Sequence, residues 1–364
     1  MVSTTVLLFD RGGRDVVSRV RTAAAQAVVD LLCGMPGVER VVVATGAPAA
    51  WERCPCTVQA DPEEWHFGAQ FTRFVQELRP SRLLYIASGA GLLFTPADWT
   101  RLLNADLPQP FAVLNNFYST DLALLVPPAP IPDLLRDNPL GIRLWHLGYA
   151  CYELPRSAAT QLDIDTPGEL QILALHPDLP ARVKEELEEI PRARAQALLS
   201  ALVDPEAEVV LVGRVSGHLL RFLDQEAACH FRVVSEERGM EASGRAERGA
   251  VVSLLGLWAE HTGPAELVRA LSRLGDVVVW DIRVIMAHYG VWPPAEERYA
   301  CDLLEAQKVS DPRLRELVQA CAESSTPFLL GGHSLVSGGM YLAVELAWIG
   351  HDREPRFRPL AFPG

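Results

Sequence analysis

Lysine is almost absent from this 364-residue chain, because only Lys184 and Lys308 stand among its 33 basic residues. Acidic residues number 46, and the formal net charge is -13 at pH 7. A charge of this sign repels phosphate backbones and anionic lipid surfaces, so neither nucleic acid nor a membrane is an expected partner. Any site for an anion has to use arginine side chains or backbone N–H groups.

Long apolar runs and paired cysteine motifs are also missing. The most apolar stretches, residues 251–259 and 340–349, are too short to cross a bilayer. The apolar run near the N-terminus stops at Asp10 and has no basic residue before it, which predicts no export signal. Seven cysteines without C-x-x-C spacing do not make a disulfide framework. A cytoplasmic protein with reduced thiols is expected.

The sequence does contain enough apolar residues, 49%, for more than one hydrophobic core. Short apolar runs end in glycine-bearing turns and alternate with segments of helical spacing. In the first half such runs lie at residues 6–9, 41–44 and 83–87. This alternation predicts an α/β fold with a Rossmann-like, mainly parallel sheet and helices on both faces.

The pattern restarts in the middle of the chain. Residues 179–202 are charged and helical in spacing, and they lead into Val203-Asp204-Pro205-Glu206. We therefore expect one domain over residues 1–203 and a second, smaller α/β domain over residues 204–364. Expected strands of the second domain lie at residues 209–212, 277–280 and 328–330.

Two segments of the first half carry a family resemblance. Residues 92–99 read LLFTPADW and residues 163–170 read DIDTPGEL. They resemble the PLLTPEDL and DIDTPEDL elements of the MobA-like nucleotidyltransferase superfamily, which includes the phospholactate guanylyltransferases. The resemblance covers roughly residues 1 to 175. It implies a GT-A-like domain that binds a nucleoside triphosphate (NTP) with Mg²⁺ and transfers the nucleotidyl group to a small phosphorylated acceptor.

The candidate metal ligands are Asp163 and Asp165. They are one residue apart, and alternate residues of an extended segment project to the same face, so both can reach one cation. Asp165 is the preferred Mg²⁺ ligand and catalytic residue. The resembled family carries a further metal-binding acid just before PLLTP, whereas residues 88–91 here read SGAG. The usual first metal ligand is therefore missing.

The glycine-rich loop of the resembled family is weakly matched by residues 10–15, DRGGRD. The resemblance implies that Arg11, Gly12 and Gly13 contact the nucleotide, and that Arg14 or Arg19 stabilises charge during transfer. The other expected nucleotide contacts are Asn115, Asn116 and Arg156.

A structural explanation competes with this one. Thr166 and Glu169 match a helix-capping box, and Asp163 and Asp165 can simply solvate a turn. The alternative hypothesis is a retired nucleotidyltransferase fold that acts as a small-molecule binding or regulatory protein. The missing acid at residues 88–91 and the missing lysine favour it.

The second half has its densest polar segment at residues 235–245, after an expected strand. Ligands of α/β sheets bind beyond the carboxyl ends of strands. Arg238 and Arg245 are candidates to clamp a phosphate or carboxylate, and Glu236 or Glu237 to act as a base or to orient those arginines. A solvated charged loop is the competing explanation.

Residues 328–339 form the other segment of interest in the second half. Gly331 and Gly332, with Ser334 after them, let backbone N–H groups approach an anion, and His333 is a candidate acid or base. A nucleophile elbow around Ser334 is disfavoured because Val336 stands where glycine is required. The third hypothesis is an enzyme that acts on a phosphorylated or carboxylated metabolite through Glu237, Arg238 and His333.

Overall fold

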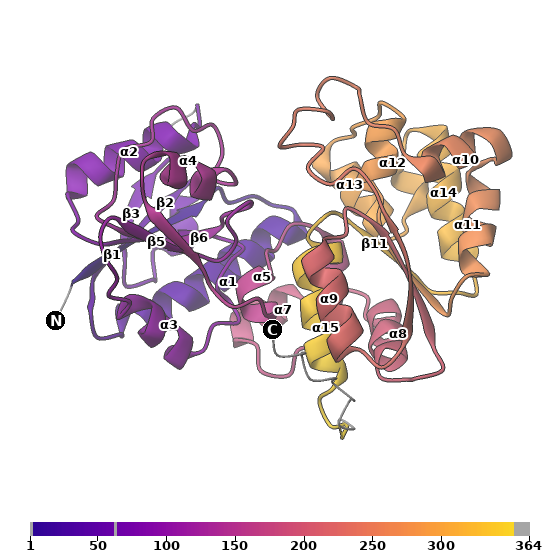
Figure 1. Ribbon diagram of the computed structural model, residues 1–364, viewed down its shortest axis with the longest axis horizontal. Helices are drawn as coiled ribbons and strands as arrows, with labels where there is room; N and C mark the ends of the chain where they lie inside the picture. Colours follow the sequence, from indigo (N-terminus) through magenta and orange to yellow (C-terminus); the bar gives the residue numbers. More distant parts are fainter. Residues whose placement is uncertain (1–2, 62–63, 353–364) are drawn as a thin grey trace, which may run out of the picture.

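The computed structural model describes residues 3–61 and 64–352, which form two α/β units, each built on a central sheet (Figure 1). The first sheet has seven strands and the second has four, as described for these residues. This architecture confirms the predicted α/β class with a second, smaller sheet. No helix in the described part of the chain is both long and apolar enough to cross a membrane.

The first sheet is mixed but mainly parallel, in the order β3-β2-β1-β4-β6-β5-β7. Only β6 among the described strands runs against its neighbours. The strands are β1 (Thr4–Asp10), β2 (Val38–Thr45), β3 (Thr57–Ala60), β4 (Leu83–Ala87), β5 (Phe111–Leu114), β6 (Leu122–Val126) and β7 (Ala150–Glu153). The apolar runs of β1, β4, β5 and β6 are buried on both faces, as expected of a sheet between two helical layers.

Alternate residues of β1 supply the two cores of the first unit. Val6 and Leu8 pack with α1 and α3, whereas Leu7 and Phe9 pack with α2 and α4 on the other face. The helices of this part of the chain are α1 (Val16–Cys33), α2 (Phe67–Leu78), α3 (Pro96–Leu103), α4 (Leu140–His146), α5 (Ala158–Gln161), α6 (Pro167–Leu173), α7 (Ala181–Glu186) and α8 (Ala193–Leu202), with a 3-10 turn at Pro48–Trp51.

The second sheet is parallel throughout, in the order β11-β10-β8-β9. Its strands are β8 (Glu208–Gly213), β9 (His230–Ser235), β10 (Val277–Asp281) and β11 (Phe328–Gly331). Its helices are α9 (Gly217–Glu226), α10 (Leu254–Thr262), α11 (Pro264–Ser272), α12 (Arg283–His288), α13 (Ala295–Asp302), α14 (Pro312–Glu323) and α15 (Met340–Ala347), with short turns at Ala306–Lys308 and Leu335–Gly339.

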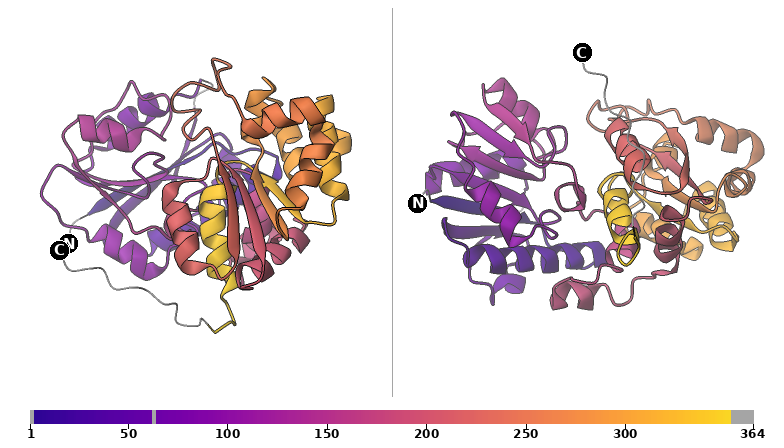
Figure 2. Two further views of the ribbon diagram at one scale, coloured as in Figure 1. Left: turned by 45° about the vertical axis from the view of Figure 1, so that its right-hand side comes forward. Right: turned by 60° about the horizontal axis from the view of Figure 1, so that its bottom comes forward.

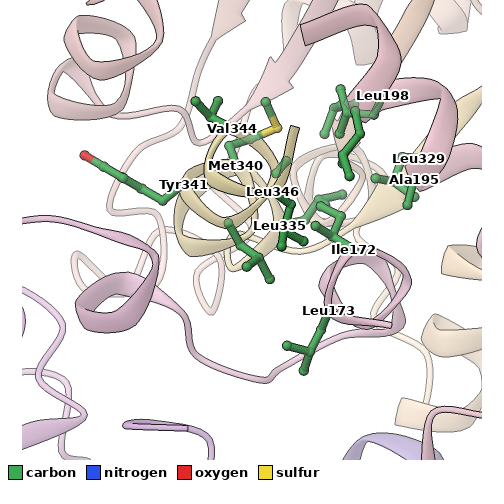
Figure 3. Close-up of a cluster of buried hydrophobic side chains, with 14 of the residues drawn as sticks. Ile172, Leu173, Ala195, Leu198, Leu329, Leu335, Met340, Tyr341, Val344 and Leu346 are labelled. Carbon is green, nitrogen blue, oxygen red and sulfur yellow. The ribbon is translucent and has the colours of Figure 1, made fainter. Parts of the chain in front are cut away.

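One hydrophobic core joins segments from both sides of the predicted boundary at residue 203. Leu198 of α8 and Ile172 of α6 pack in one cluster with Leu329 of β11 and Met340 of α15 (Figure 3). In every view α15 lies near the middle of the molecule, between the first unit and α10, α11 and α14 (Figures 1 and 2). The helices of residues 167–202 therefore cover the second sheet, and the boundary at 203 stays a prediction.

Candidate functional site

The strand order of the first sheet reverses between β1 and β4, because β2 lies on the far side of β1. Open α/β sheets bind ligands beyond the strand ends at such a point. The loop of residues 163–166 reaches this place, since a Cβ on Gly89 would lie 2.2 Å from Oδ1 of Asp163. Glycine at position 89 therefore leaves room for the Asp163 carboxylate.

Four carboxylates gather at this edge of the first sheet. Burial raises the pKa of Asp121 and of Asp163 well above the usual range. The charge of Asp137 raises the pKa of Asp121 further, and the charge of Asp165 does the same for Asp163. Asp137 also accepts a hydrogen bond from Tyr85 Oη at 2.7 Å. Carboxylates that raise one another's pKa favour uptake of a cation or a proton.

Arg21 of α1 is the cation that the structure places in this cluster. Its guanidinium pairs with Asp165 and donates to the carbonyl of Ile164. Burial lowers the pKa of Arg21, but the carboxylates of Asp165 and Asp163 outweigh this and raise it above its usual value. Asp165, one of the two predicted metal ligands, is thus held in an ion pair that no local sequence pattern predicts.

The carboxylates fit Mg²⁺ by their chemistry. Mg²⁺ prefers oxygen ligands and commonly uses one or two protein carboxylates, with water and substrate phosphates filling its other positions. Among the described residues, no group of three or more Asp, Glu, His or Cys side chains has the arrangement of a metal site. Metal binding by Asp163 and Asp165 stays a prediction.

The loop of residues 10–15 curls tightly after β1. Asp10 is buried and accepts hydrogen bonds from Gly12 N (3.2 Å) and Trp51 Nε1 (3.0 Å). Gly13 has a φ of 151°, and a Cβ there would lie 2.3 Å from Ser18 Oγ, so no larger residue fits. These contacts fix the loop at the same edge as Asp163.

The arginines of this loop differ in what they contact. Arg11 lies over the ring of Trp65 at 4.7 Å, and its Nε is 3.7 Å from Oδ2 of Asp61. Arg14 is exposed and its side chain has no hydrogen bond or ion pair with the described residues. Arg19, the alternative to Arg14, pairs with Glu186 of α7 at 2.8 Å.

Asp61 is a candidate site residue that the sequence analysis missed. Its side chain is 5% exposed, and neither carboxylate oxygen has a hydrogen-bond partner among the described residues. Burial raises the pKa of Asp61 to about 6, although Arg11 acts in the opposite direction. Nothing in the local sequence distinguishes this aspartate, because its burial follows from the packing of β3 against the loop after β1.

Replacing Asp61 with asparagine should make stability less dependent on pH. The folded-state pKa is raised above that of the unfolded chain, so the carboxylate supports folding below about pH 4, and this support is lost as the pH rises through about 6. We expect Asp61→Asn to be more stable than the parent by about 2 kcal/mol at pH 8 and by less than half as much at pH 4.5. Urea unfolding at both pH values, with exposed Asp178→Asn as control, measures this. Equal effects at the two pH values would contradict it.

The other predicted nucleotide contacts form hydrogen bonds within the protein. Asn115 is buried, and its Oδ1 accepts from Asp121 N at 3.0 Å, so it positions that aspartate. Asn116 Oδ1 accepts from Tyr118 N in a turn. Arg156 donates to Glu153 Oε1 and Gln161 Oε1, both at 3.2 Å. Their contact with a nucleotide stays a prediction.

The second sheet also reverses its strand order, between β8 and β10, and buried ion pairs mark that point. Arg214 follows β8 and forms two hydrogen bonds with Asp281, which ends β10, at 2.6 and 3.2 Å. Glu241 contacts the same guanidinium at 2.8 Å. Arg283 pairs with Asp302 through two bonds of 2.8 and 2.6 Å. These arginines are neutralised by protein carboxylates.

His333 follows β11 at the same edge, with an exposed side chain. Desolvation by the surrounding protein lowers the pKa of His333, and the Arg214 guanidinium lowers it further. Asp281, Glu241 and Asp165 raise it. Its neighbour Gly332 donates to Thr166 Oγ1, so His333 lies beside the loop that carries Asp165.

The segment of residues 236–252 extends beyond the second sheet (Figure 1). Within it, Glu237 pairs with Arg245 through two bonds of 3.0 and 2.8 Å. Arg238 is exposed and has no such partner among the residues the structure describes. Glu247 lies 3.9 Å from Arg136 of the first unit, so the segment spans from one unit to the other. Arg245, one of the two arginines predicted to clamp an anion, is thus already paired with Glu237.

The glycines after β11 pack against the first unit. Gly332 N donates to Thr166 Oγ1 at 3.4 Å, and a Cβ on Gly331 would lie 3.0 Å from the same oxygen. Ser334 is 6% exposed, and its Oγ has no hydrogen-bond partner in the described part of the chain. We call the contact of residues 163–166 with residues 331–334 the junction.

Glu169 fixes the first-unit side of the junction. It is fully buried, and its carboxylate accepts from Asp165 N at 2.5 Å and from the backbone N and the Oγ1 of Thr166. Burial raises the pKa of Glu169 to about 7. The capping box predicted from Thr166 and Glu169 is present, and it holds the loop that carries Asp163 and Asp165.

Comparison with solved structures shows similarity over about half of this chain to proteins of nucleotidyl transfer. CMP:2-keto-3-deoxy-manno-octonic acid synthetase in complex with CTP is 12% identical, with a TM-score of 0.36, and covers 47% of this chain and 96% of that one. A putative nucleotide-diphospho-sugar transferase from Desulfovibrio desulfuricans is 13% identical, with a TM-score of 0.40, over 52% of this chain and 99% of that one.

A cytidylyltransferase from Leptospira borgpetersenii is 11% identical, with a TM-score of 0.38, and covers 51% of this chain and 92% of that one. No protein-family model matches the chain, and no curated protein matches it.

Proposed function

We propose that the edge of the first sheet transfers a nucleotidyl group from an NTP to a small phosphorylated acceptor. The observation that carries this proposal is the position of Asp163 and Asp165. Both lie on a loop held against the ends of β1 and β4, where an open α/β sheet binds its ligand. The resemblance of residues 163–170 to a nucleotidyltransferase motif supports the same function.

Each residue at this edge has a part in the proposed reaction. Asp163 and Asp165 would hold Mg²⁺, which neutralises phosphate charge when bound. Arg21 orients their loop through the carbonyl of Ile164. Arg14 is exposed in the loop before α1, where its guanidinium can stabilise charge that develops on the departing pyrophosphate.

The nucleotide base would lie beside β3. Asp61 has two acceptor oxygens without a donor in the described residues, and Arg11 lies on Trp65 next to it. A base that carries an amino group would donate to the carboxylate of Asp61, and such a bond strengthens when the acceptor is ionised.

Thermal unfolding with each of the four NTPs, with and without Mg²⁺, tests the proposal. A ligand at about a hundred times its Kd stabilises the native state by about 2.7 kcal/mol. We expect one NTP to raise the unfolding temperature only with Mg²⁺, and Asp163→Asn to abolish the rise. Asp178→Asn, in an exposed loop, is the matched control. A rise that is unchanged in Asp163→Asn would contradict the assignment of this metal ligand.

A retired nucleotidyltransferase fold is the second candidate, and the ion pair between Arg21 and Asp165 favours it. A guanidinium in this position supplies the positive charge that Mg²⁺ otherwise brings. In that case the first sheet binds a small molecule without chemistry. Stabilisation by a nucleotide equally with and without Mg²⁺ would support this candidate.

A further inference from the structure

In each sheet a candidate site lies where the strand order reverses, and these two sites lie next to each other. Thr166 Oγ1 accepts from Gly332 N in the junction, so Asp165 and His333 are each one residue from a direct contact between the units. Tyr299 of α13 packs against the hydrophobic core that joins α6 to β11, so it lies beside the same segments. Residues of the second unit therefore border the proposed transfer site.

We propose that the edge of the second sheet at His333 and Tyr299 is the acceptor subsite of this reaction, for a small molecule that carries a phosphate group. This inference rests on the proposed function of the first sheet. In this proposal the two sheets bind the two substrates of one reaction. An independent enzyme in the second unit would instead bind its substrate without the first sheet.

The groups that remain available at this edge are hydrogen-bond donors. Arg214 and Arg283 are already paired with buried carboxylates, so they fix the edge rather than bind a ligand. The side chains of His333 and Tyr299 have no hydrogen bond with the described residues. Burial raises the pKa of Tyr299, so its phenol stays protonated and donates. Neutral His333 donates from one ring nitrogen.

Arg298 supplies the positive charge that a phosphate needs. It precedes Tyr299 on α13, and its guanidinium lies 5.3 Å from the ring centre of Trp292. One nitrogen donates to the carbonyl of Pro293 at 2.6 Å, and Arg298 has no carboxylate partner among the described residues. A planar guanidinium with unused N–H groups can donate two parallel hydrogen bonds to a phosphate.

The second unit has little freedom to withdraw from the first. A Cβ on Gly338 would lie 2.1 Å from the carbonyl oxygen of Gln161 and 2.6 Å from the Cα of Leu162. Backbones this close, next to the junction, leave no space between the segments that carry Asp163 and His333. An acceptor held at His333 is therefore also held in a fixed position relative to Asp163 and Asp165.

In the transfer step an oxygen of the acceptor phosphate attacks the α-phosphorus of the NTP. The bond from the α-phosphorus to the oxygen bridging the α- and β-phosphates breaks, and pyrophosphate leaves with that electron pair. The acceptor phosphate is already ionised at neutral pH, so no proton has to be removed from the nucleophile. His333 and Tyr299 hold the acceptor by hydrogen bonds and are positioning residues.

Inorganic phosphate is the probe for this subsite. It is titrated into the full chain with Mg²⁺ and the non-hydrolysable α,β-methylene analogue of the NTP selected by thermal unfolding. Calorimetry gives the Kd for phosphate, and NMR follows the ring signals of the nine histidines. We expect the His333 signal, assigned by its loss in His333→Gln, to shift saturably only when the analogue is bound.

The variants separate the subsite from a general effect on the protein. His333→Gln and Tyr299→Phe should each weaken phosphate binding about tenfold, as loss of one hydrogen bond to a charged group predicts. Both should leave binding of the analogue unchanged. His230→Gln is the matched control, because His230 begins β9 at the opposite end of the same sheet.

Each outcome decides between the proposals. If the analogue binds but the His333 signal does not respond to phosphate, the acceptor lies elsewhere and only this inference fails. A phosphate response that is the same without the analogue shows an adventitious ion only and also overturns the inference. If neither an NTP nor the analogue binds, the proposed function fails and this inference fails with it.

Discussion

Replacing Gly338 with alanine should lower the free energy of unfolding by about 3 kcal/mol, because the added methyl group has no space. A Cβ at this position would lie 2.1 Å from the carbonyl oxygen of Gln161 and 2.6 Å from the Cα of Leu162. These are backbone atoms of the segment before the junction, which cannot move aside as a flexible side chain can. The segments that carry the two candidate sites would be forced apart.

Urea unfolding followed by tryptophan fluorescence measures this effect. Gly217→Ala is the matched control, since Gly217 begins α9 and a Cβ there meets no atom within 4 Å. That substitution should be neutral or raise stability by up to about 1 kcal/mol, as glycine-to-alanine changes do in an unstrained helix. A Gly338→Ala protein as stable as Gly217→Ala would show that the two segments are not in close contact.

The sequence predicts the elements of both sheets better than their association. Apolar runs such as residues 6–9 and 209–212 are strands because both faces of each sheet are covered, which leaves a continuous apolar signal. The core that joins α6 and α8 to α15 leaves no such signal. Ile172 of α6 and Met340 of α15 are 168 positions apart in the chain. Helical spacing shows that a helix face is apolar without showing what covers it.

In the candidate site, too, local sequence patterns are predicted and long-range contacts are not. Asp163, Asp165 and the capping box are local patterns, and the motif of residues 163–170 predicts them together. Arg21 pairs with Asp165 across 144 positions of the chain, so no local pattern connects the two. The glycines after β11 indicate a close approach. Only the structure shows that residues 161–168 make that approach in the folded chain.

The edge of the second sheet depends on a buried ion pair, and breaking that pair should be more damaging than removing it. Arg283 and Asp302 are 5% and 0% exposed at the side chain, and two hydrogen bonds of 2.8 and 2.6 Å join them. Replacing Arg283 with methionine leaves the Asp302 carboxylate buried without its partner. We expect a loss of about 3 to 5 kcal/mol at pH 8.

The double variant Arg283→Met with Asp302→Leu should recover most of that stability, to within about 1 kcal/mol of the parent, since two apolar side chains of similar volume leave no buried charge. Burial already raises the pKa of Asp302, and loss of Arg283 raises it further. The single variant should therefore lose less stability at pH 5 than at pH 8, because protonation of Asp302 relieves the buried charge. Urea unfolding of the parent and both variants at the two pH values measures these differences. If the double variant is no more stable than Arg283→Met, the cost comes from packing at this edge and not from the unpaired carboxylate.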